Sequence, residues 1–350
     1  MNSILEKDIK EIALNSLIDW SKLKNKKILI TGATGLICSI MIKAMEYRNR
    51  YLNLNLTMYL LVRNKEDAEK IFGNNENIKY IEKNVEDIDN VNFNIDYIIH
   101  GASPTKSKFF IENPVETLDT SIIGTRKVLE LAKTNNIKSM VYLSSMEMYG
   151  TMNSNNVEED DLGYINPLEV RSSYSEGKRV GELYCYSFFS EFNLPVKIGR
   201  IAQTFGAGIS KNESRVYKVF ADAIINKKDI VLKSSGSTII NFSYTTDTIL
   251  GLIYILLNGK NGEAYNIVGD KTNMTILESA KWLVEEFGTS DMNVIVEIPK
   301  ENAGFAPDNK MVLSNEKMKK IGWNCKYDIK DGYRKLIEYL LEEKNNNNWC

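Results

Sequence analysis

The segment YSEGK places a phenol and an ammonium four residues apart, at Tyr174 and Lys178. In a helix this spacing puts both side chains on one face. An ammonium beside a phenol favours the phenolate, which can remove a hydroxyl proton while a hydride leaves the same carbon. Ser173 and Glu176 match the S-x-x-E capping box, which predicts Tyr174 in the first helical turn. The pattern points to alcohol oxidation or carbonyl reduction.

Two further motifs lie where they could serve the same reaction. Ser145 closes the apolar segment VYLSS, and the carboxyl end of a parallel strand faces the ligand crevice of an open α/β sheet. KILITGATGLIC places Gly32 and Gly35 between an apolar strand and a helix, where glycines let backbone N–H groups approach a pyrophosphate. A Tyr-Lys pair alone is more often an exposed pair without a catalytic role, and a glycine pair alone is weak evidence for a dinucleotide site. Their combination predicts a dinucleotide-dependent site.

The end of the second predicted strand bears on the choice of dinucleotide. An acidic side chain there accepts the ribose hydroxyls of NAD, whereas an arginine accommodates the 2′-phosphate of NADP. LLVRNK offers Arg63 and Lys65 and no acid. These residues could equally form a solvated basic turn. With Arg63 as a cofactor contact, we expect NADP to bind at least as well as NAD.

Alternating strands and helices must bring these residues together, and the sequence from Lys26 onward has this alternation. Apolar strands are predicted at 26–31, 56–62, 78–81, 96–100, 139–145 and 195–201. Helices are predicted at 35–47, 65–73, 114–134 and 173–192, and an amphipathic helix at 3–23 precedes the first strand. Short apolar strands separated by helices indicate an α/β fold with a doubly wound parallel sheet. From about residue 271 the chain is expected to be mainly helical.

Composition excludes several other classes of protein. In 350 residues, 44 Lys and Arg against 46 Asp and Glu give a net charge of −2, so nucleic-acid binding through bulk charge is not expected. The longest apolar run, at 249–257, is too short to cross a membrane, and no secretion signal is evident. Four scattered cysteines and a single histidine, His100, indicate no metal site and no disulfide framework. We therefore expect a cytoplasmic protein.

With these motifs in view, the chain from about Lys26 to 340 resembles the extended short-chain dehydrogenase/reductase family, the nucleotide-sugar epimerases and dehydratases. The matching segments are TGATGLI, HGASP, NPVETL…GT, YLSSMEMYG, RSSYSEGKRVGE, RIAQTFGAG and SRVYKVF. The resemblance implies catalytic Ser145, Tyr174 and Lys178, transient oxidation of a sugar at carbon 4, and NAD as cofactor. The cofactor contacts then comprise Gly32, Ala33, Thr34, Gly35, Leu36, Ile37, Arg63, Ala102, Ser103, Tyr174 and Lys178.

The same resemblance implies a domain organisation and an assembly. A Rossmann-like NAD(P)-binding domain is expected at 26–204 and about 241–270, preceded by an N-terminal helical extension at 1–25. A smaller, mainly helical substrate-binding domain is expected at 205–240 and 271–350. The predicted helix 114–134 and the helix bearing Tyr174 resemble those that pair across a two-fold axis, so a homodimer is expected. Relatives of this kind act in cell-surface polysaccharide biosynthesis.

The segment SSMEMYG bears on the reaction. The dehydratases of this family have an acid after the Ser or Thr to protonate the departing hydroxyl, whereas Met146 has no proton to give. Glu147 remains as a catalytic candidate, although it could instead cap a backbone turn. The motifs are most similar to UDP-glucuronate decarboxylases, whose 4-keto intermediate loses carbon dioxide without a leaving-group acid. The alternatives are an epimerase, a 4,6-dehydratase and an NADPH-dependent keto-sugar reductase; a non-enzymatic sensor would not need this proton machinery.

Three positions depart from the family pattern. Ser121 and Gln203 stand where asparagine is usual, and Ile240 replaces an arginine that contacts the nucleotide diphosphate. Loss of one guanidinium removes a bidentate anion clamp. The expected substrate contacts are Ser103, Lys106, Met146, Gln203 and Arg215. Lys106 and Lys108 could supply substitute charge or simply be exposed, and His100 is expected to be structural.

Overall fold

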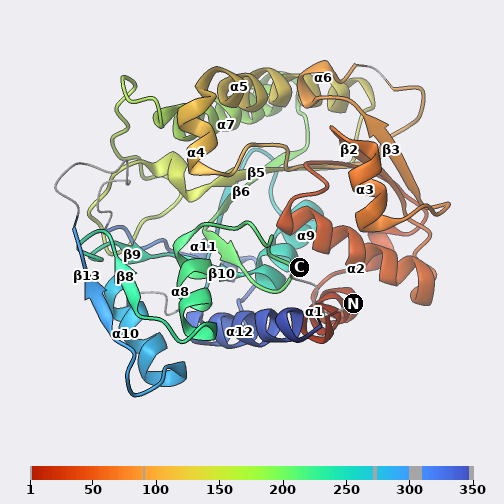
Figure 1. Cartoon of the computed structure of the whole chain (residues 1–350). Coiled ribbons are helices and arrows are strands. Elements are labelled where there is room, and N and C mark those ends of the chain that lie inside the picture. The colour runs from red at the N-terminus through yellow and green to blue at the C-terminus, as the bar shows by residue number, and fades with distance from the viewer. Residues whose placement is uncertain (1, 90, 271–273, 299–309, 347–350) are drawn as a thin grey trace.

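A seven-stranded parallel sheet forms the centre of the protein (Figure 1). A computed structural model describes residues 2–89, 91–270, 274–298 and 310–346. The strand order is β11-β6-β5-β4-β1-β2-β3, and every neighbouring pair is parallel. The strands are β1 (Lys27–Thr31), β2 (Thr57–Val62), β3 (Ile78–Glu82), β4 (Tyr97–His100), β5 (Ser139–Ser145), β6 (Val196–Ile201) and β11 (Ala264–Ile267). This confirms the predicted doubly wound α/β fold.

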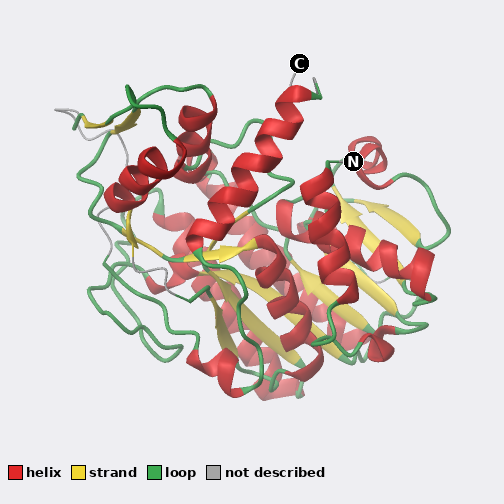
Figure 2. Cartoon of the chain, turned by 90° about the horizontal axis from the view of Figure 1, so that it is seen from below, coloured by secondary structure: helices red, strands yellow, loops and turns green. Residues whose placement is uncertain are grey.

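Helices cover both faces of this sheet, as its strands of almost wholly buried residues require (Figures 1 and 2). The face drawn uppermost in Figure 1 carries α4 (Ser107–Glu112), α5 (Pro114–Asp119), the π-helical turn η3 (Thr120–Gly124), α6 (Thr125–Thr134) and α7 (Ser172–Phe192). The opposite face carries α2 (Leu36–Leu52) and α9 (Thr245–Asn258). Beside β3 lies α3 (Lys65–Phe72), whereas the short η2 (Val85–Asp87) packs against α6 and η3. The sheet is thereby enclosed as the middle of three layers.

The remaining elements form a smaller region beside the carboxyl ends of β5 and β6. It contains α8 (Val216–Ile225), α10 (Ile276–Phe287), α11 (Glu316–Lys320) and α12 (Ile329–Asn345). Three short strand pairs join them: β7 (Gln203–Phe205) with β10 (Phe242–Tyr244), β8 (Ile230–Leu232) with β13 (Val294–Val296), and β9 (Ile239–Ile240) with β12 (Met274–Thr275). The last pair alone is antiparallel. This agrees with the mainly helical character expected after residue 271.

The first helix, α1 (Ser3–Leu14), packs outside α2 and α9 and against α12. The buried carboxylate of Asp8 forms an ion pair of 2.6 Å with Lys335 and accepts a hydrogen bond of 2.5 Å from Tyr244 Oη. Asn2 donates from Nδ2 to the Tyr339 carbonyl at 3.1 Å. The two ends of the described chain are therefore joined in one apolar core.

Two predicted helices differ from the structure. The helix expected at 3–23 ends at Leu14, because the Asn15 side chain accepts from Leu17 N at 2.9 Å and turns the chain; a 3-10 turn, η1 (Trp20–Leu23), follows. The helix expected at 114–134 is interrupted by the π turn η3, in which Gly124 lies against the side chain of Val85. Among the described residues, no helix is both long and apolar enough to span a membrane.

Candidate active site

The glycine loop lies where β1 meets α2, at the carboxyl edge of the sheet. Gly32 has φ +67°, and a Cβ there would lie 2.4 Å from the Gly101 carbonyl oxygen in the loop that follows the neighbouring strand β4. Only glycine fits so close an approach at positive φ. The loops after two adjacent strands thus form a continuous floor for a ligand.

The N-terminus of α2 is suited to an anion. Gly35 is its N-cap, so no side chain caps the first amides, and the first turn contains no acidic residue. Thr34 and Gly35 are exposed, and Leu36 and Ile37 are partly exposed, whereas Ala33 is buried. Uncapped N–H groups at the positive end of a helix attract a pyrophosphate. This cradle therefore fits a dinucleotide held by Gly32, Gly35 and the first amides of α2.

A buried chain of hydrogen bonds fixes the second loop of this floor. Ala102 N donates to Thr31 Oγ1 at 3.0 Å, and Thr31 Oγ1 lies 2.7 Å from His100 Nδ1. On the other side of the ring, His100 Nε2 lies 3.0 Å from Thr125 Oγ1, so the imidazole bridges two buried hydroxyls. Burial, with the charge of Lys178, lowers the pKa of His100 to about 3. His100 is thus a neutral support beneath Ala102.

Cys38 packs against the same loop. The thiol is buried, and a Cβ at Gly101 would lie 2.8 Å from its sulfur. Burial raises the pKa of this thiol to about 12. Cys38 is therefore an unreactive packing residue whose sulfur occupies the space that Gly101 leaves open.

The candidate catalytic residues come from β5 and α7, which pack together. Ser145 ends β5, and Tyr174 and Lys178 lie on successive turns of α7. The ring of Tyr174 is buried and stacks on Phe110 with centroids 4.3 Å apart. The Ser145 hydroxyl acts on the Tyr174 phenol through a hydrogen bond, and Lys178 Nζ lies 5.8 Å from the phenol ring centroid. The structure therefore brings the three predicted residues together.

The predicted lowering of the pKa of Tyr174 by Lys178 is wrong. Burial raises the pKa of Tyr174 to about 12, and the charge of Glu147 adds to the rise. The hydrogen bond to Ser145 and the charges of Arg215 and Arg171 act in the other direction but are outweighed. Lys178 donates from Nζ to the Leu143 carbonyl at 2.8 Å, and burial lowers its own pKa to about 8. Lys178 is thus turned toward β5.

The predicted capping box is also wrong. No side chain caps α7; Ser173 donates from Oγ to the Phe110 carbonyl at 3.4 Å instead. A turn before the helix already provides acceptors, because Ser172 N and Ser173 N donate to the carbonyls of Glu169 and Val170. The cap is therefore unnecessary, and α7 begins one residue earlier than predicted, with Tyr174 in its first turn.

Glu147 lies in the 3-10 turn η4 (Met146–Tyr149) that follows Ser145. Arg171 donates from both terminal nitrogens to its carboxylate, at 2.9 Å and 3.2 Å. Met146 beside it is partly exposed and has no proton to give. Arg171 was not predicted as a site residue, although it stands three residues before Tyr174 in a matching segment.

The predicted substrate contacts are less closely grouped. Arg215 lies near enough to lower the pKa of Tyr174, but Glu213 holds its guanidinium with hydrogen bonds of 3.0 Å and 2.5 Å. Although burial raises the pKa of Glu213, the hydrogen bonds and charge of Arg215 lower it to about 2. Gln203 lies partly buried in β7 and Ser103 partly buried after β4, whereas Lys106 is exposed before α4.

Arg63 stands exposed beyond β2, with Glu116 on α5 at 3.9 Å. Ile240 is buried in β9 and paired with Met274. Ser121 is buried beneath Gly177 in the π turn. The described ranges hold no group of three or more His, Cys, Asp or Glu side chains suited to a metal ion.

Residues 28–268 match the model of the NAD dependent epimerase/dehydratase family. The chain belongs to this family. It is therefore an enzyme of an NAD-dependent family, and the match spans the glycine loop, Ser145, Tyr174 and Lys178.

Relatives in this family differ in their reactions. UDP-glucuronic acid decarboxylase 1 of Danio rerio is 28% identical over 99% of this chain and 82% of its own length. The human dTDP-D-glucose 4,6-dehydratase is 26% identical over 93% of this chain and 92% of its own length.

The fold is shared with solved structures. The UDP-glucose 4-epimerase of Thermotoga maritima, solved with UDP-glucose, superposes with a TM-score of 0.74 at 19% identity, covering 91% of this chain and 99% of the other. The Bordetella bronchiseptica enzyme WbmF, solved with NAD+, gives 0.72 at 21% identity, covering 94% and 96%. These similarities show the architecture, whereas the choice of reaction depends on the residues of the site.

Proposed function

We propose that this chain is an NAD(P)-dependent nucleotide-sugar enzyme that transiently oxidises carbon 4 of the sugar and decarboxylates a UDP-glucuronate-like substrate. The observation that carries the proposal is the meeting of Ser145, Tyr174 and Lys178 at the carboxyl edge of the sheet, beside the glycine loop. The sequence relationship to UDP-glucuronic acid decarboxylases supports the substrate class. Bound NAD would supply the hydride acceptor, held by the Gly32–Gly35 loop and the α2 N-terminus.

Each residue of the site has its own part in this reaction. Tyr174 removes the proton of the carbon-4 hydroxyl, Ser145 hydrogen-bonds the same oxygen, and Lys178 holds the helix against β5 through the Leu143 carbonyl. Oxidation makes the sugar acid a β-keto acid. Its carboxyl carbon then leaves as carbon dioxide, and the electron pair of the broken bond passes into the carbon-4 carbonyl, giving an enolate that takes up a proton. The hydride then returns to carbon 4 while Tyr174 gives the proton back to its oxygen, so the net change is loss of carbon dioxide.

The neighbours of Ser145 favour decarboxylation over dehydration. A 4,6-elimination needs an acid for the departing hydroxyl, and Met146 has none. Glu147 has both carboxylate oxygens engaged by Arg171. Loss of carbon dioxide needs no such acid. Epimerisation and dehydration stand as second and third outcomes, and a net NADPH-dependent reduction of a keto sugar is the alternative that Arg63 and Ile240 favour.

A panel of UDP-, CDP-, dTDP- and GDP-sugars, followed by mass spectrometry, tests this proposal. Loss of one carbon dioxide is the expected result with UDP-glucuronate. Loss of one water, gain of two hydrogens or an unchanged mass with a new stereochemistry would instead identify dehydration, reduction or epimerisation. If no sugar in the panel reduces the bound cofactor or changes in mass or configuration, carbon-4 oxidation is refuted.

We expect NADP to bind at least as well as NAD. At the end of β2, the side chain of Arg63 is 78% exposed. Its ion pair with Glu116, at 3.9 Å, is weak because both side chains are exposed. Titration of both cofactors into stripped protein measures the preference. Arg63→Gln should weaken NADP binding selectively, whereas Lys70→Gln, a matched change in the last turn of α3, should not. A clear preference of the unaltered protein for NAD contradicts the role of Arg63.

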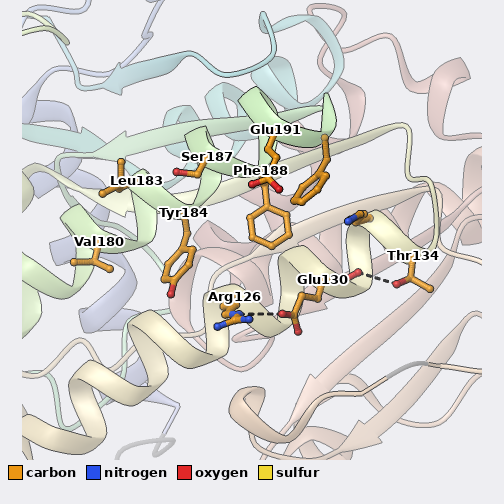
Figure 3. A pocket seen from close by; sticks show the side chains of 11 residues that line it. Arg126, Glu130, Thr134, Val180, Leu183, Tyr184, Ser187, Phe188 and Glu191 are labelled. Carbon is orange, nitrogen blue, oxygen red and sulfur yellow. Dashed lines mark hydrogen bonds and ion pairs between the residues drawn. The ribbon is translucent and has the colours of Figure 1, made fainter.

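A homodimer, a cytoplasmic location and a place in cell-surface polysaccharide biosynthesis belong to the same proposal. The dimer has a candidate face in an open groove of about 680 Å³ between α6 and α7 (Figure 3). The side chains that line it are Arg126, Glu130, Lys133, Thr134, Val180, Leu183, Tyr184, Ser187, Phe188, Glu191 and Phe192. Leu183 and Tyr186 expose 64% and 54% of their surface on α7. Paired helices from a second copy would cover them.

Leu183→Glu is expected to convert the dimer to a monomer, because it places a charge in the middle of this apolar face. Analytical ultracentrifugation of the full chain measures the result. Leu341→Glu on α12, where leucine is 41% exposed, is the control and should leave the dimer intact. A monomeric unaltered protein at micromolar concentration would rule out the dimer.

A further inference from the structure

The two candidate catalytic hydroxyls lie on separate segments, and one ion pair ties these segments together. Ser145 begins the 3-10 turn η4, whereas Tyr174 lies in the first turn of α7. Glu147 and Arg171 are 24 positions apart in the chain, and their fork of two hydrogen bonds spans the ends of the loop between the segments. Such bidentate pairs fix geometry better than a single contact does.

Each partner of this ion pair is also joined to a catalytic residue through the backbone. Glu147 N donates to Ser145 Oγ at 3.2 Å. Tyr174 N donates to the Arg171 carbonyl at 3.4 Å. Because Arg171 is 27% exposed and Glu147 31% exposed, the pair lies at the partly exposed edge of the site. A shift of either side chain would therefore move a catalytic hydroxyl.

The charges of the pair act on the phenol in opposite directions. Burial is the main cause of the raised pKa of Tyr174. The charge of Glu147 raises this pKa further, whereas the charge of Arg171 lowers it. The charged or titratable groups that face Tyr174 are Glu147 on η4, Arg171 at the N-cap of α7, Lys178 on α7, Tyr142 on β5 and Arg215 before α8. Arg215, although paired with Glu213, also lowers the pKa of Tyr174, and its effect is larger than that of Arg171. The pair of Glu147 and Arg171 is distinct in placing two opposite charges at the phenol from the two segments that bear the catalytic hydroxyls.

We propose that Arg171 is a positioning residue that acts through Glu147, holding η4 against α7 and offsetting the negative charge that Glu147 places beside Tyr174. The inference rests on the proposed function, because it assigns a role within that same site. In this role Arg171 limits how far the neighbouring carboxylate raises the pKa of Tyr174. Arg171 touches neither cofactor nor substrate in this role.

Three variants test the inference through the pH dependence of carbon-4 oxidation by the holoenzyme. Arg171→Gln leaves the carboxylate uncompensated, which raises the pKa of Tyr174, so the acid limb of the kcat profile should move up by about one pH unit. At pH 7 this corresponds to about a tenfold loss of kcat, with KM changed less than about threefold. Glu147→Gln should move the limb down, and the double variant should return it close to its original position.

Two controls separate this role from a merely structural one. Arg171→Lys keeps the charge but not the fork, so it should restore the position of the limb while recovering kcat only in part. Arg179→Gln removes an arginine of the same helix that holds η4 through the carbonyls of Met148 and Tyr149. This variant should leave the limb in place whatever it does to kcat. An equal shift in Arg179→Gln, or shifts of one sign in both Arg171→Gln and Glu147→Gln, would overturn the inference.

The effect of the same variants on the ionisation of Tyr174 can also be measured without a sugar substrate. In protein labelled with ¹³Cζ-tyrosine, the Tyr174 signal is identified by its loss in Tyr174→Phe, and the onset of its ionisation is followed on raising the pH. The role of Arg171 is supported, even if no nucleotide sugar is turned over, when Tyr174 begins to ionise at a higher pH in Arg171→Gln and at a lower pH in Glu147→Gln. The role is refuted when ionisation begins at the same pH in all variants. If these shifts in the ionisation of Tyr174 are seen but no sugar is turned over, the result counts against the proposed function alone.

Discussion

Tyr174→Phe is expected to lower kcat for carbon-4 oxidation by on the order of a thousandfold while cofactor binding is retained. The phenol is the group placed to take the hydroxyl proton, and phenylalanine has no oxygen to replace it. The ring itself should stay in position, because its stacking on Phe110 at 4.3 Å does not involve the hydroxyl. Loss of activity would therefore report lost proton transfer rather than a collapsed site.

Turnover by mass spectrometry and cofactor binding by calorimetry measure the two halves of this prediction. Tyr186→Phe is the matched control, since Tyr186 lies on the same helix but is 54% exposed and far along it from Tyr174. That variant should retain full activity. Turnover in Tyr174→Phe within threefold of the unaltered enzyme would show that another group takes the proton.

Gly32→Ala is expected to weaken cofactor binding at least about a hundredfold, a loss of about 2.7 kcal/mol. The new methyl group would lie 2.4 Å from the Gly101 carbonyl oxygen and 2.8 Å from Ala102 N, both backbone atoms that no side-chain movement can displace. The glycine loop and the Ala102 loop must separate, and the backbone amides then no longer converge on one pyrophosphate. Calorimetric titration with NAD and NADP measures the effect.

Gly73→Ala distinguishes this steric effect from simple backbone strain. Gly73 also has a positive φ, +70°, but a Cβ there would meet nothing within 4 Å, and it precedes β3 at the opposite edge of the sheet. Its replacement should cost about 1–3 kcal/mol of stability and leave cofactor affinity unchanged. Equal cofactor affinities in the Gly32 and Gly73 variants would contradict the proposed cradle.

The sequence was sufficient for the parts of the site that depend on local pattern. The glycines after the first strand, Ser145 at the end of a strand, and the i, i+4 spacing of Tyr174 and Lys178 are properties of single elements. In a parallel sheet all of these residues lie at the carboxyl edge, so their proximity follows from the fold class alone. The same applies to the order of strands and helices, whose apolar periodicity is strong.

The remaining features depend on contacts between distant segments. Arg171 and Glu147 are 24 positions apart, so no spacing rule pairs them. The pKa of Tyr174 is raised because the folded chain buries the phenol, an effect that outweighs the neighbouring charges and that no motif encodes. The capping box failed because a turn at Glu169 had already supplied the acceptors.

The packing of α1 against α12 has a consequence for the order of folding. The helix α1, Ser3–Leu14, has part of its buried surface on α12, Ile329–Asn345, which lies more than 300 positions later in the chain. Buried Asp8 pairs with Lys335 of this later helix. During synthesis α1 can pack on the neighbouring α2 early, but its side that faces α12 stays uncovered until α12 has been made.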